Sequence, residues 1–187
     1  ITRGSESGGA VAVELAGKIC GDLGHRGVMV LGAGDTSERV ARSLVSRGVK
    51  TVIVSNRTFD RAAQLAGEIG GRAIHFDHWQ NEFPDVDILI SSTAAPHPVV
   101  TREKLEPMMR QRAGRPLFII DLAVPRDVDP EANRIDGVFL YDIDSLQAIA
   151  TRSMAVRQRE VEHCERIIDT HVVDFVGWLR RVQHSLA

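Results

Sequence analysis

Short apolar runs alternate with longer segments of helical periodicity along most of this chain, and this alternation limits what it can fold into. The short runs predict six strands, at residues 28–31, 51–55, 72–75, 87–91, 117–122 and 138–140. Segments 36–47, 59–69 and 102–112 have the apolar spacing of amphipathic helices. Strands that alternate with helices form parallel sheets with right-handed crossovers. The pattern predicts an α/β fold with a doubly wound parallel sheet in the strand order 3-2-1-4-5-6.

The two ends of the chain depart from this alternation. Residues 1–9 are rich in glycine and serine and predict a linker, whereas residues 10–23 have helical spacing. From Asp144 onward there is no proline, and no glycine before Gly177. A helix of roughly 40 residues would be about 60 Å long, so we expect it to project from the sheet. The chain therefore divides into a linker with a first helix (1–23), a sheet domain (24–143) and a long helix (144–187).

The long helix carries an apolar stripe at nearly heptad spacing. The stripe consists of Val161, Ile168, Val172, Phe175, Leu179, Val182 and Leu186. A stripe on a projecting helix needs a partner, and a second copy of the chain is the simplest cover. We therefore expect a homodimer through this helix. Because the stripe still continues at Leu186, we expect the helix to be truncated.

Composition excludes several classes of function. The net charge of −2 and a pI near 6.4 give no basic footprint for nucleic acid, so any RNA contact has to be local. No apolar run approaches the ~20 residues that cross a bilayer, and no membrane contact is expected. Cys20 and Cys164 lack CxxC spacing, which favours a reducing cytoplasm over a disulfide framework. His75 and His78 lack a third ligand, so we interpret them as surface histidines.

A glycine-rich turn follows the first predicted strand and opens the first helix after it. The turn consists of Gly32, Ala33, Gly34, Asp35, Thr36 and Ser37. Glycine is needed where the chain turns tightly and where backbone approaches a pyrophosphate, and the helix N-terminus then supplies free N–H groups. Ser37 stands where a third glycine is common, and it is small enough for close packing. The turn predicts a dinucleotide site rather than an ordinary strand–helix connection.

The end of the second predicted strand indicates which dinucleotide binds. An NAD site has a carboxylate there for the ribose 2′-hydroxyl. This chain has Asn56, Arg57 and Thr58 instead, with no acid before Asp60. A guanidinium can pair with a 2′-phosphate that a carboxylate would repel, so the sequence favours NADPH. The alternative is that these residues form only a turn and a helix cap, with Thr58 as the cap.

Two further loops follow the fourth and fifth predicted strands, on the other side of the point where nucleotides bind. In the first, Ser92, Thr93 and Ala94 are small enough to let backbone approach the cofactor. His97 in the same loop is interpreted either as a proton donor or, at least as readily, as a packing residue. In the second loop, Val124 and Pro125 are expected to cover the nicotinamide ring. We expect the adjacent Arg126 and Asp127 to form a structural ion pair.

The combined motifs resemble the NADPH-binding domain of glutamyl-tRNA reductase. They read LGAGDTSERVARSL, NRTFDRAAQLA, SSTAAPHPVV, DLAVPRDVDP and YDIDSLQ. The first two are shared with shikimate dehydrogenase-like domains, and the later ones are more diagnostic. The resemblance implies a Rossmann-like domain in an enzyme that uses NADPH to reduce glutamyl-tRNA to glutamate-1-semialdehyde, in tetrapyrrole (porphyrin and heme) biosynthesis. It also implies that the long helix leads to a dimerisation domain.

In that family, a cysteine of a separate N-terminal domain attacks the aminoacyl ester, and the resulting thioester takes hydride from NADPH. That domain also receives glutamyl-tRNA, and it is expected to be missing here, because the chain starts at Ile1 without a methionine. Cys20 and Cys164 match no catalytic position of the family. No catalytic residue is therefore assigned, and the isolated chain is expected to be inactive.

Two alternatives remain at this point. One is the NADP-binding domain of a shikimate dehydrogenase-like oxidoreductase, against which the diagnostic loops and the long helix argue. The other is a dimerisation or docking module with a vestigial nucleotide site. A measurement of NADPH binding would distinguish this module from both the reductase domain and the shikimate dehydrogenase-like domain.

Overall fold

The computed structural model describes residues 3–185, and the side chains of residues 9–152, 155–156 and 158–178. The chain separates into two compact units, Ile1–Ala148 and Ile149–Ala187. The first unit contains the whole sheet, and the described residues of the second are helical.

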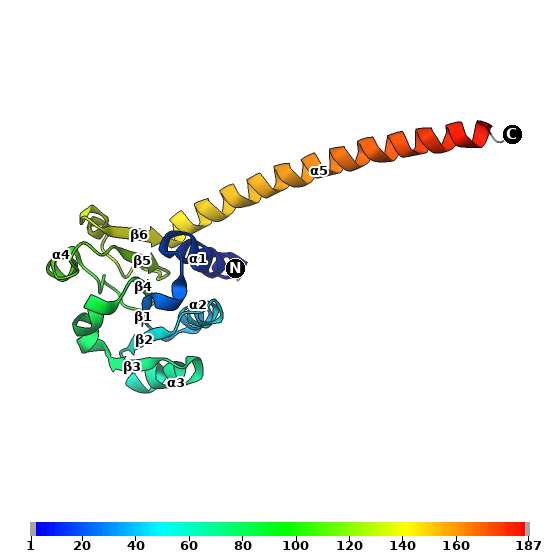
Figure 1. The fold of residues 1–187 in the computed structure, drawn as a ribbon. Helices are drawn as coiled ribbons and strands as arrows, with labels where there is room; N and C mark the ends of the chain where they lie inside the picture. Colours follow the sequence, from blue (N-terminus) through cyan, green and yellow to red (C-terminus); the bar gives the residue numbers. More distant parts are fainter. Residues whose placement is uncertain (1–2, 186–187) are drawn as a thin grey trace. The chain divides into compact units, whose positions relative to one another are not determined.

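A six-stranded, fully parallel sheet forms the centre of the first unit (Figure 1). Its order is β3-β2-β1-β4-β5-β6, which confirms the predicted doubly wound arrangement. The strands are β1 (Gly27–Leu31), β2 (Thr51–Asn56), β3 (Arg72–His75), β4 (Ile88–Ser91), β5 (Leu117–Asp121) and β6 (Val138–Asp142). The order reverses between β1 and β4, and ligands of such sheets bind beyond the carboxyl ends of the strands at this reversal.

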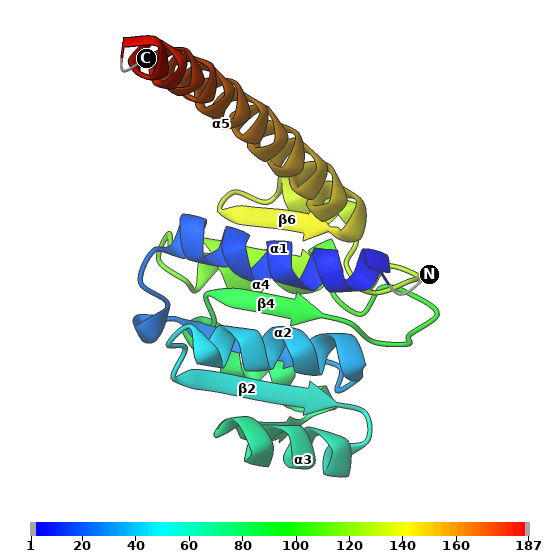
Figure 2. The ribbon, with the colours of Figure 1, turned by 90° about the vertical axis from the view of Figure 1, so that its right-hand side faces the viewer.

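Helices cover both faces of the sheet, which is why its central strands are continuously apolar. Figure 2 shows α1 (Arg3–Cys20), α2 (Asp35–Ser46) and α3 (Phe59–Ile69) over one face. The other face packs against α4 (Arg102–Arg110) and a 3₁₀ segment, Phe76–Asp85. Successive strand residues point to opposite faces, so Val28 and Val30 enter one core whereas Met29 and Leu31 enter the other.

The predicted linker at residues 1–9 is wrong for residues 3–9, because α1 already begins at Arg3. Glycine and serine are poor helix formers, and this composition suggested a linker. Packing onto α2 overrides the propensity: a Cβ at Gly9 would lie 3.1 Å from Cγ2 of Val40. The helix also ends at Cys20, and the segment Leu23–His25 forms a separate 3₁₀ turn.

The long C-terminal helix is confirmed as α5, Ile143–Ser185. Asp142 caps its first turn, since its Oδ1 accepts hydrogen bonds from the backbone N–H and the hydroxyl of Ser145. Leu146 is fully buried in the core of the first unit. No helix of the described residues is long and apolar enough to span a membrane.

Candidate functional site

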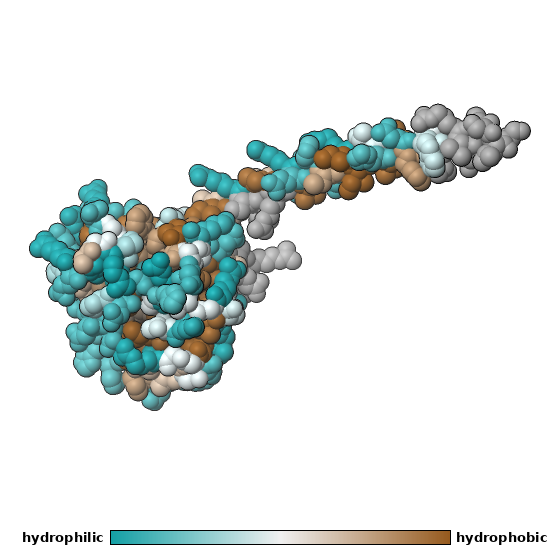
Figure 3. All heavy atoms as spheres, in the orientation of Figure 1, coloured by the Kyte–Doolittle hydropathy of each residue, from teal (hydrophilic) through white to brown (hydrophobic). Residues whose placement is uncertain are grey.

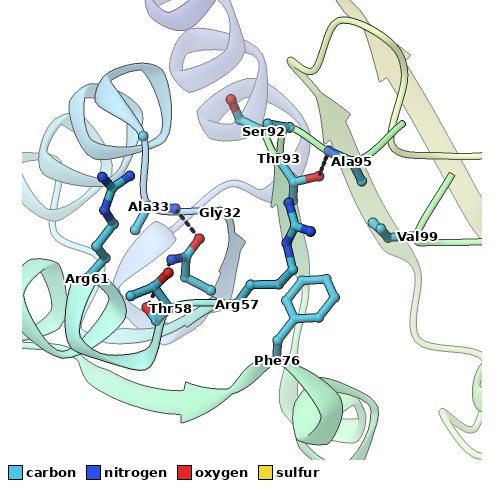
Figure 4. A pocket seen from close by; sticks show the side chains of 13 residues that line it. Gly32, Ala33, Arg57, Thr58, Arg61, Phe76, Ser92, Thr93, Ala95 and Val99 are labelled. Atoms are coloured by element: carbon cyan, nitrogen blue, oxygen red, sulfur yellow. Dashed lines mark hydrogen bonds between the residues drawn. The ribbon is translucent and has the colours of Figure 1, made fainter. Parts of the chain in front are cut away.

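A cavity of about 420 Å³ lies where the carboxyl ends of β1, β2 and β4 meet (Figure 4). It contains most of the predicted cofactor-binding residues: Gly32, Ala33, Gly34, Asn56, Arg57, Thr58, Ser92, Thr93 and Ala94. Arg61, Phe76, Ala95 and Val99 also line it and were not predicted. Asp35, Thr36, Ser37, Val124 and Pro125 are not among the lining residues. The sheet topology thus brings together segments that are far apart in the sequence.

Gly32 makes the turn out of β1 possible. Its φ of +96° lies in the left-handed region, and a Cβ there would lie 2.3 Å from the carbonyl oxygen of Ser92. Only glycine therefore fits between β1 and the loop after β4. This close approach fixes the distance between the two loops that border the cavity.

The N-terminus of α2 is open at Gly34, which occupies the N-cap position without a side-chain cap. A Cβ at Gly34 would meet nothing within 4 Å. Free backbone N–H groups in the first turn of a helix, beside open space, form an anion-binding site. The residues present therefore fit the pyrophosphate of a dinucleotide. Ser37 is fully buried one turn further along α2, and its hydroxyl has no hydrogen-bond partner among the described residues.

Asn56 connects the glycine turn to the turn after β2. Its Oδ1 accepts a hydrogen bond of 3.3 Å from Ala33 N, and its Nδ2 donates to the carbonyl of Thr58 at 2.9 Å. Thr58 is the N-cap residue of α3, but its side chain makes no capping hydrogen bond. Thr58 is thus the cap residue that the sequence suggested, and it acts through its carbonyl, which accepts a hydrogen bond from Arg61 N at 3.2 Å.

Arg57, from the turn after β2, and Arg61, from the first turn of α3, both line the cavity (Figure 4). In this view the guanidinium of Arg57 points toward Thr93, whereas that of Arg61 lies on the opposite side. Within residues 9–178, as far as side chains are described, neither makes an ion pair with a carboxylate. Arg42, on the neighbouring α2, instead pairs with both Glu38 and Glu68. The cavity therefore presents positive charge that no described carboxylate neutralises, and such charge suits an anionic ligand.

The expected ion pair between Arg126 and Asp127 is wrong. Arg126 is exposed and pairs with Asp142 and Asp144, whereas Asp127 is fully buried and accepts hydrogen bonds from β4. The reason is that the chain bends at Asp127, and the two side chains have different partners there. Arg126 points outward and Asp127 inward.

A second buried carboxylate, Asp121, ends β5 beside this position. It accepts hydrogen bonds from the backbone N–H groups of Ala123, Asp127 and Val128. Burial raises the pKa of Asp121 above its usual range, and these backbone N–H groups offset part of that effect. Asp121 thus holds the loop that follows β5 by its backbone.

Other predicted positions lie at the surface. Val124 is 79% exposed and is joined to Pro125 by a cis peptide bond, so its contact with a nicotinamide ring stays a prediction. His97, His75 and His78 are exposed, and His75 stacks on Phe59 at 4.3 Å. No cluster of three metal-ligating side chains occurs among the residues that the structure describes.

A parallel sheet in this order, with a glycine turn after β1 and a cation after β2, defines a nucleotide-binding domain of the kind found in nicotinamide-dependent dehydrogenases. The chain belongs to the shikimate/quinate 5-dehydrogenase family, whose model matches residues 14–149.

Similarity to individual proteins is more specific. The chain is 48% identical over 168 residues to glutamyl-tRNA reductase of Akkermansia muciniphila, which covers 90% of the chain and 49% of that protein. It is 43% identical over 172 residues to glutamyl-tRNA reductase of Trichlorobacter lovleyi, which covers 92% of the chain and 40% of that protein. The solved glutamyl-tRNA reductase from Methanopyrus kandleri superposes with a TM-score of 0.77 at 41% identity, over 87% of the chain and 41% of that structure. The resemblance seen in the motifs is confirmed, and the chain spans about half or less of these relatives.

Proposed function

We propose that this chain is the NADPH-binding domain of a glutamyl-tRNA reductase, part of an enzyme that reduces glutamyl-tRNA to glutamate-1-semialdehyde for tetrapyrrole synthesis. The single observation that carries the cofactor choice is that the guanidinium groups of Arg57 and Arg61 line the cavity and have no carboxylate partner among the described side chains. The relatives named above support the choice of reaction.

Each part of the cavity then has a role. The backbone at Gly32 and Gly34 and the first turn of α2 hold the pyrophosphate. Arg57 and Arg61 bind the 2′-phosphate, and Asn56 keeps the turn that carries Arg57 next to the glycine turn. The loop from Ser92 to Ala95 borders the nicotinamide side. NADPH, when bound, supplies a hydride, and these residues orient it.

The nucleophile of the reaction is assigned to a part of the enzyme outside this chain. Cys20 ends α1 beside the amino ends of the strands, at the opposite edge of the sheet from the cavity. Burial raises the pKa of its thiol, which disfavours the reactive thiolate. Glutamyl-tRNA is accordingly a partner of the whole enzyme through that other part.

NADPH is expected to bind this chain roughly ten- to a hundredfold more tightly than NADH, because a charge-assisted pair contributes about 1.5–3 kcal/mol. Arg57→Ala should remove most of this preference and leave NADH affinity unchanged. Titration of the intrinsic fluorescence of each reduced cofactor measures both affinities. Arg134→Ala is the matched control, since Arg134 is exposed and pairs with Glu131 away from the cavity. If the unsubstituted chain binds the two cofactors with equal affinity, the assignment of NADPH as its cofactor is wrong.

We also propose that α5 pairs with a second copy of the chain. Among the described side chains of the stripe, Val161, Ile168, Val172 and Phe175 are 50%, 60%, 53% and 59% exposed. Leu179 and Val182 have side chains outside the described set, and Leu186 lies outside the described residues. Figure 3 shows apolar residues gathered along this helix. Each large apolar side chain left in water forgoes about 1.5–3 kcal/mol, which favours a symmetric helix pair.

Ile168→Glu combined with Phe175→Glu is expected to convert a concentration-dependent dimer into a monomer, because it places charge in the middle of the pairing seam. Val173→Glu is the matched control, since Val173 is 69% exposed but lies about 100° around the helix from Val172. Light scattering over a range of concentrations reports the mass. A monomeric unsubstituted chain at high concentration would contradict pairing through α5.

A further inference from the structure

Asp127 is a buried carboxylate that the proposed cofactor roles do not use. Its exposure is 0%, and within the described part of the chain it has no cationic partner. A buried charge without a counter-ion is costly unless several hydrogen bonds stabilise it. The groups that donate to Asp127 therefore indicate why a carboxylate stands here.

All the donors to its side chain come from the end of β4 and the residues just after it. Oδ2 accepts from the hydroxyl of Ser91 at 2.7 Å and from the backbone N–H of Thr93 at 2.6 Å. Oδ1 accepts from the hydroxyl of Thr93. The same hydroxyl accepts from the backbone N–H of Ala95 at 3.1 Å. The carboxylate thus holds the first residues of the β4 loop.

The backbone of Asp127 holds the other end of that loop. Its carbonyl accepts hydrogen bonds from Val99 N at 2.8 Å and Val100 N at 3.0 Å. Its own N–H donates to Asp121 Oδ2 at 3.0 Å, which ties it to the end of β5. One residue therefore closes the β4 loop at both of its ends and anchors it to the neighbouring strand.

The loop held in this way forms one wall of the cavity. Thr93, Ala95 and Val99 all line it, and the carbonyl of Ser92 is in close approach to Gly32 on the other side. The wall is on the β4 side of the point where the strand order reverses, whereas Arg57 and Arg61 are on the β2 side. The two halves of a dinucleotide bind on these two sides.

We propose that Asp127 is a positioning residue for the nicotinamide half of the cofactor: its carboxylate fixes the Ser92–Ala95 wall against which that half binds. This rests on the proposed function, because it assumes a dinucleotide in the cavity. Asp127 itself touches neither cofactor nor substrate, and acts through Thr93.

The test compares two ligands of the intact chain, NADPH and adenosine 2′,5′-bisphosphate. The second carries the 2′-phosphate and adenosine but no nicotinamide. Asp127→Asn retains the shape of the side chain, but its single amide oxygen cannot accept from all three donors. We expect this variant to bind NADPH at least about tenfold more weakly, and to bind the bisphosphate within about twofold of the unsubstituted chain.

A second variant keeps the test decisive if Asp127→Asn folds poorly. Ser91→Ala removes one of the donors to Asp127, and Ser91 does not line the cavity. We expect this variant to lose less NADPH affinity than Asp127→Asn and to keep its affinity for the bisphosphate. Asp129→Asn is the matched control, because its carboxylate caps the next turn at Glu131 N and does not hold the loop.

The possible results separate the two proposals. If the affinities for both ligands fall equally and the melting temperature falls as well, Asp127 only stabilises the fold, and the inference is overturned. Unchanged NADPH affinity in both variants would overturn it as well. Failure of the unsubstituted chain to bind either ligand would instead contradict the proposed function.

Discussion

Replacement of Gly32 by alanine is expected to abolish cofactor binding and to lower the free energy of unfolding by about 3 kcal/mol or more. Two effects add up at this position. A φ of +96° is strained for any residue with a Cβ, and the new Cβ would lie 2.3 Å from the carbonyl oxygen of Ser92. Both atoms belong to the border of the cavity, so relief of the clash moves the β4 loop away from the glycine turn.

Two other glycines provide the controls. Gly67 lies inside α3 in open space, and Gly67→Ala should stabilise the chain slightly, by up to about 1 kcal/mol. Gly34→Ala also meets no neighbour, so it should cost only about 1 kcal/mol or less, the difference between glycine and alanine at an N-cap. It should nevertheless weaken NADPH binding, because the cavity needs bare backbone there. Thermal unfolding and cofactor titration on the three variants measure these effects. A Gly32→Ala chain with full stability and affinity would contradict the geometry.

Replacement of Arg112 by alanine is expected to destabilise the chain by about 2–4 kcal/mol. The Arg112 side chain is fully buried and donates to the carbonyls of Phe83 at 2.8 Å, Pro116 at 2.9 Å and Arg115 at 3.3 Å. Its guanidinium also lies 5.4 Å from the centre of the Phe83 ring. Burial lowers the pKa of Arg112 from its usual value, but an arginine stays charged at neutral pH.

The melting temperature should fall by about 5–15 °C, since 1 kcal/mol shifts a chain of this size by about 2–4 °C. Arg110→Ala is the matched control: its side chain is 77% exposed and pairs with Glu106 on the helix surface, so its loss should change stability by less than about 1 kcal/mol. The ratio of NADPH to NADH affinity should be the same in both variants, because Arg112 lies near the start of β5. Equal melting temperatures of the two variants would show that the buried hydrogen bonds contribute nothing.

The sheet order could be predicted from sequence because it depends on repeated, local signals. Each apolar run was long enough for a buried strand, and each was separated from the next by a segment of another periodicity. The start of α1 could not be predicted, because the segment before Ala10 has a linker composition and becomes helical through packing of Gly9 against Val40. Such a contact joins residues that no local pattern relates.

The site was predictable to the extent that it lies directly after strands. The glycine turn follows β1 without a gap, and Arg57 and Thr58 follow Asn56, the last residue of β2. Arg61 had a usable signal, because the first turn of a helix that starts beside a nucleotide site also faces it. Phe76 had the same signal as the glycine turn, because it directly follows β3, whereas Val99 had none, since it reaches the cavity from the far end of a loop. Asp127 was misread because sequence neighbours suggest pairs, whereas its partners Ser91 and Thr93 are more than 30 positions away.

The cavity is built from two stretches of chain that leave the ribosome at different times. From Gly27 to His75 the elements follow one another, and β2 pairs with its sequence neighbours β1 and β3. β4 must insert beside β1 from the far side, as the hydrogen bond from Gly27 N to Asp87 illustrates across 60 positions. A nascent chain therefore already contains Arg57 and Arg61 before the residues of the wall held by Asp127 have been added. The part of the site that would select the nucleotide is made first, and the part that would orient its reactive end is made last.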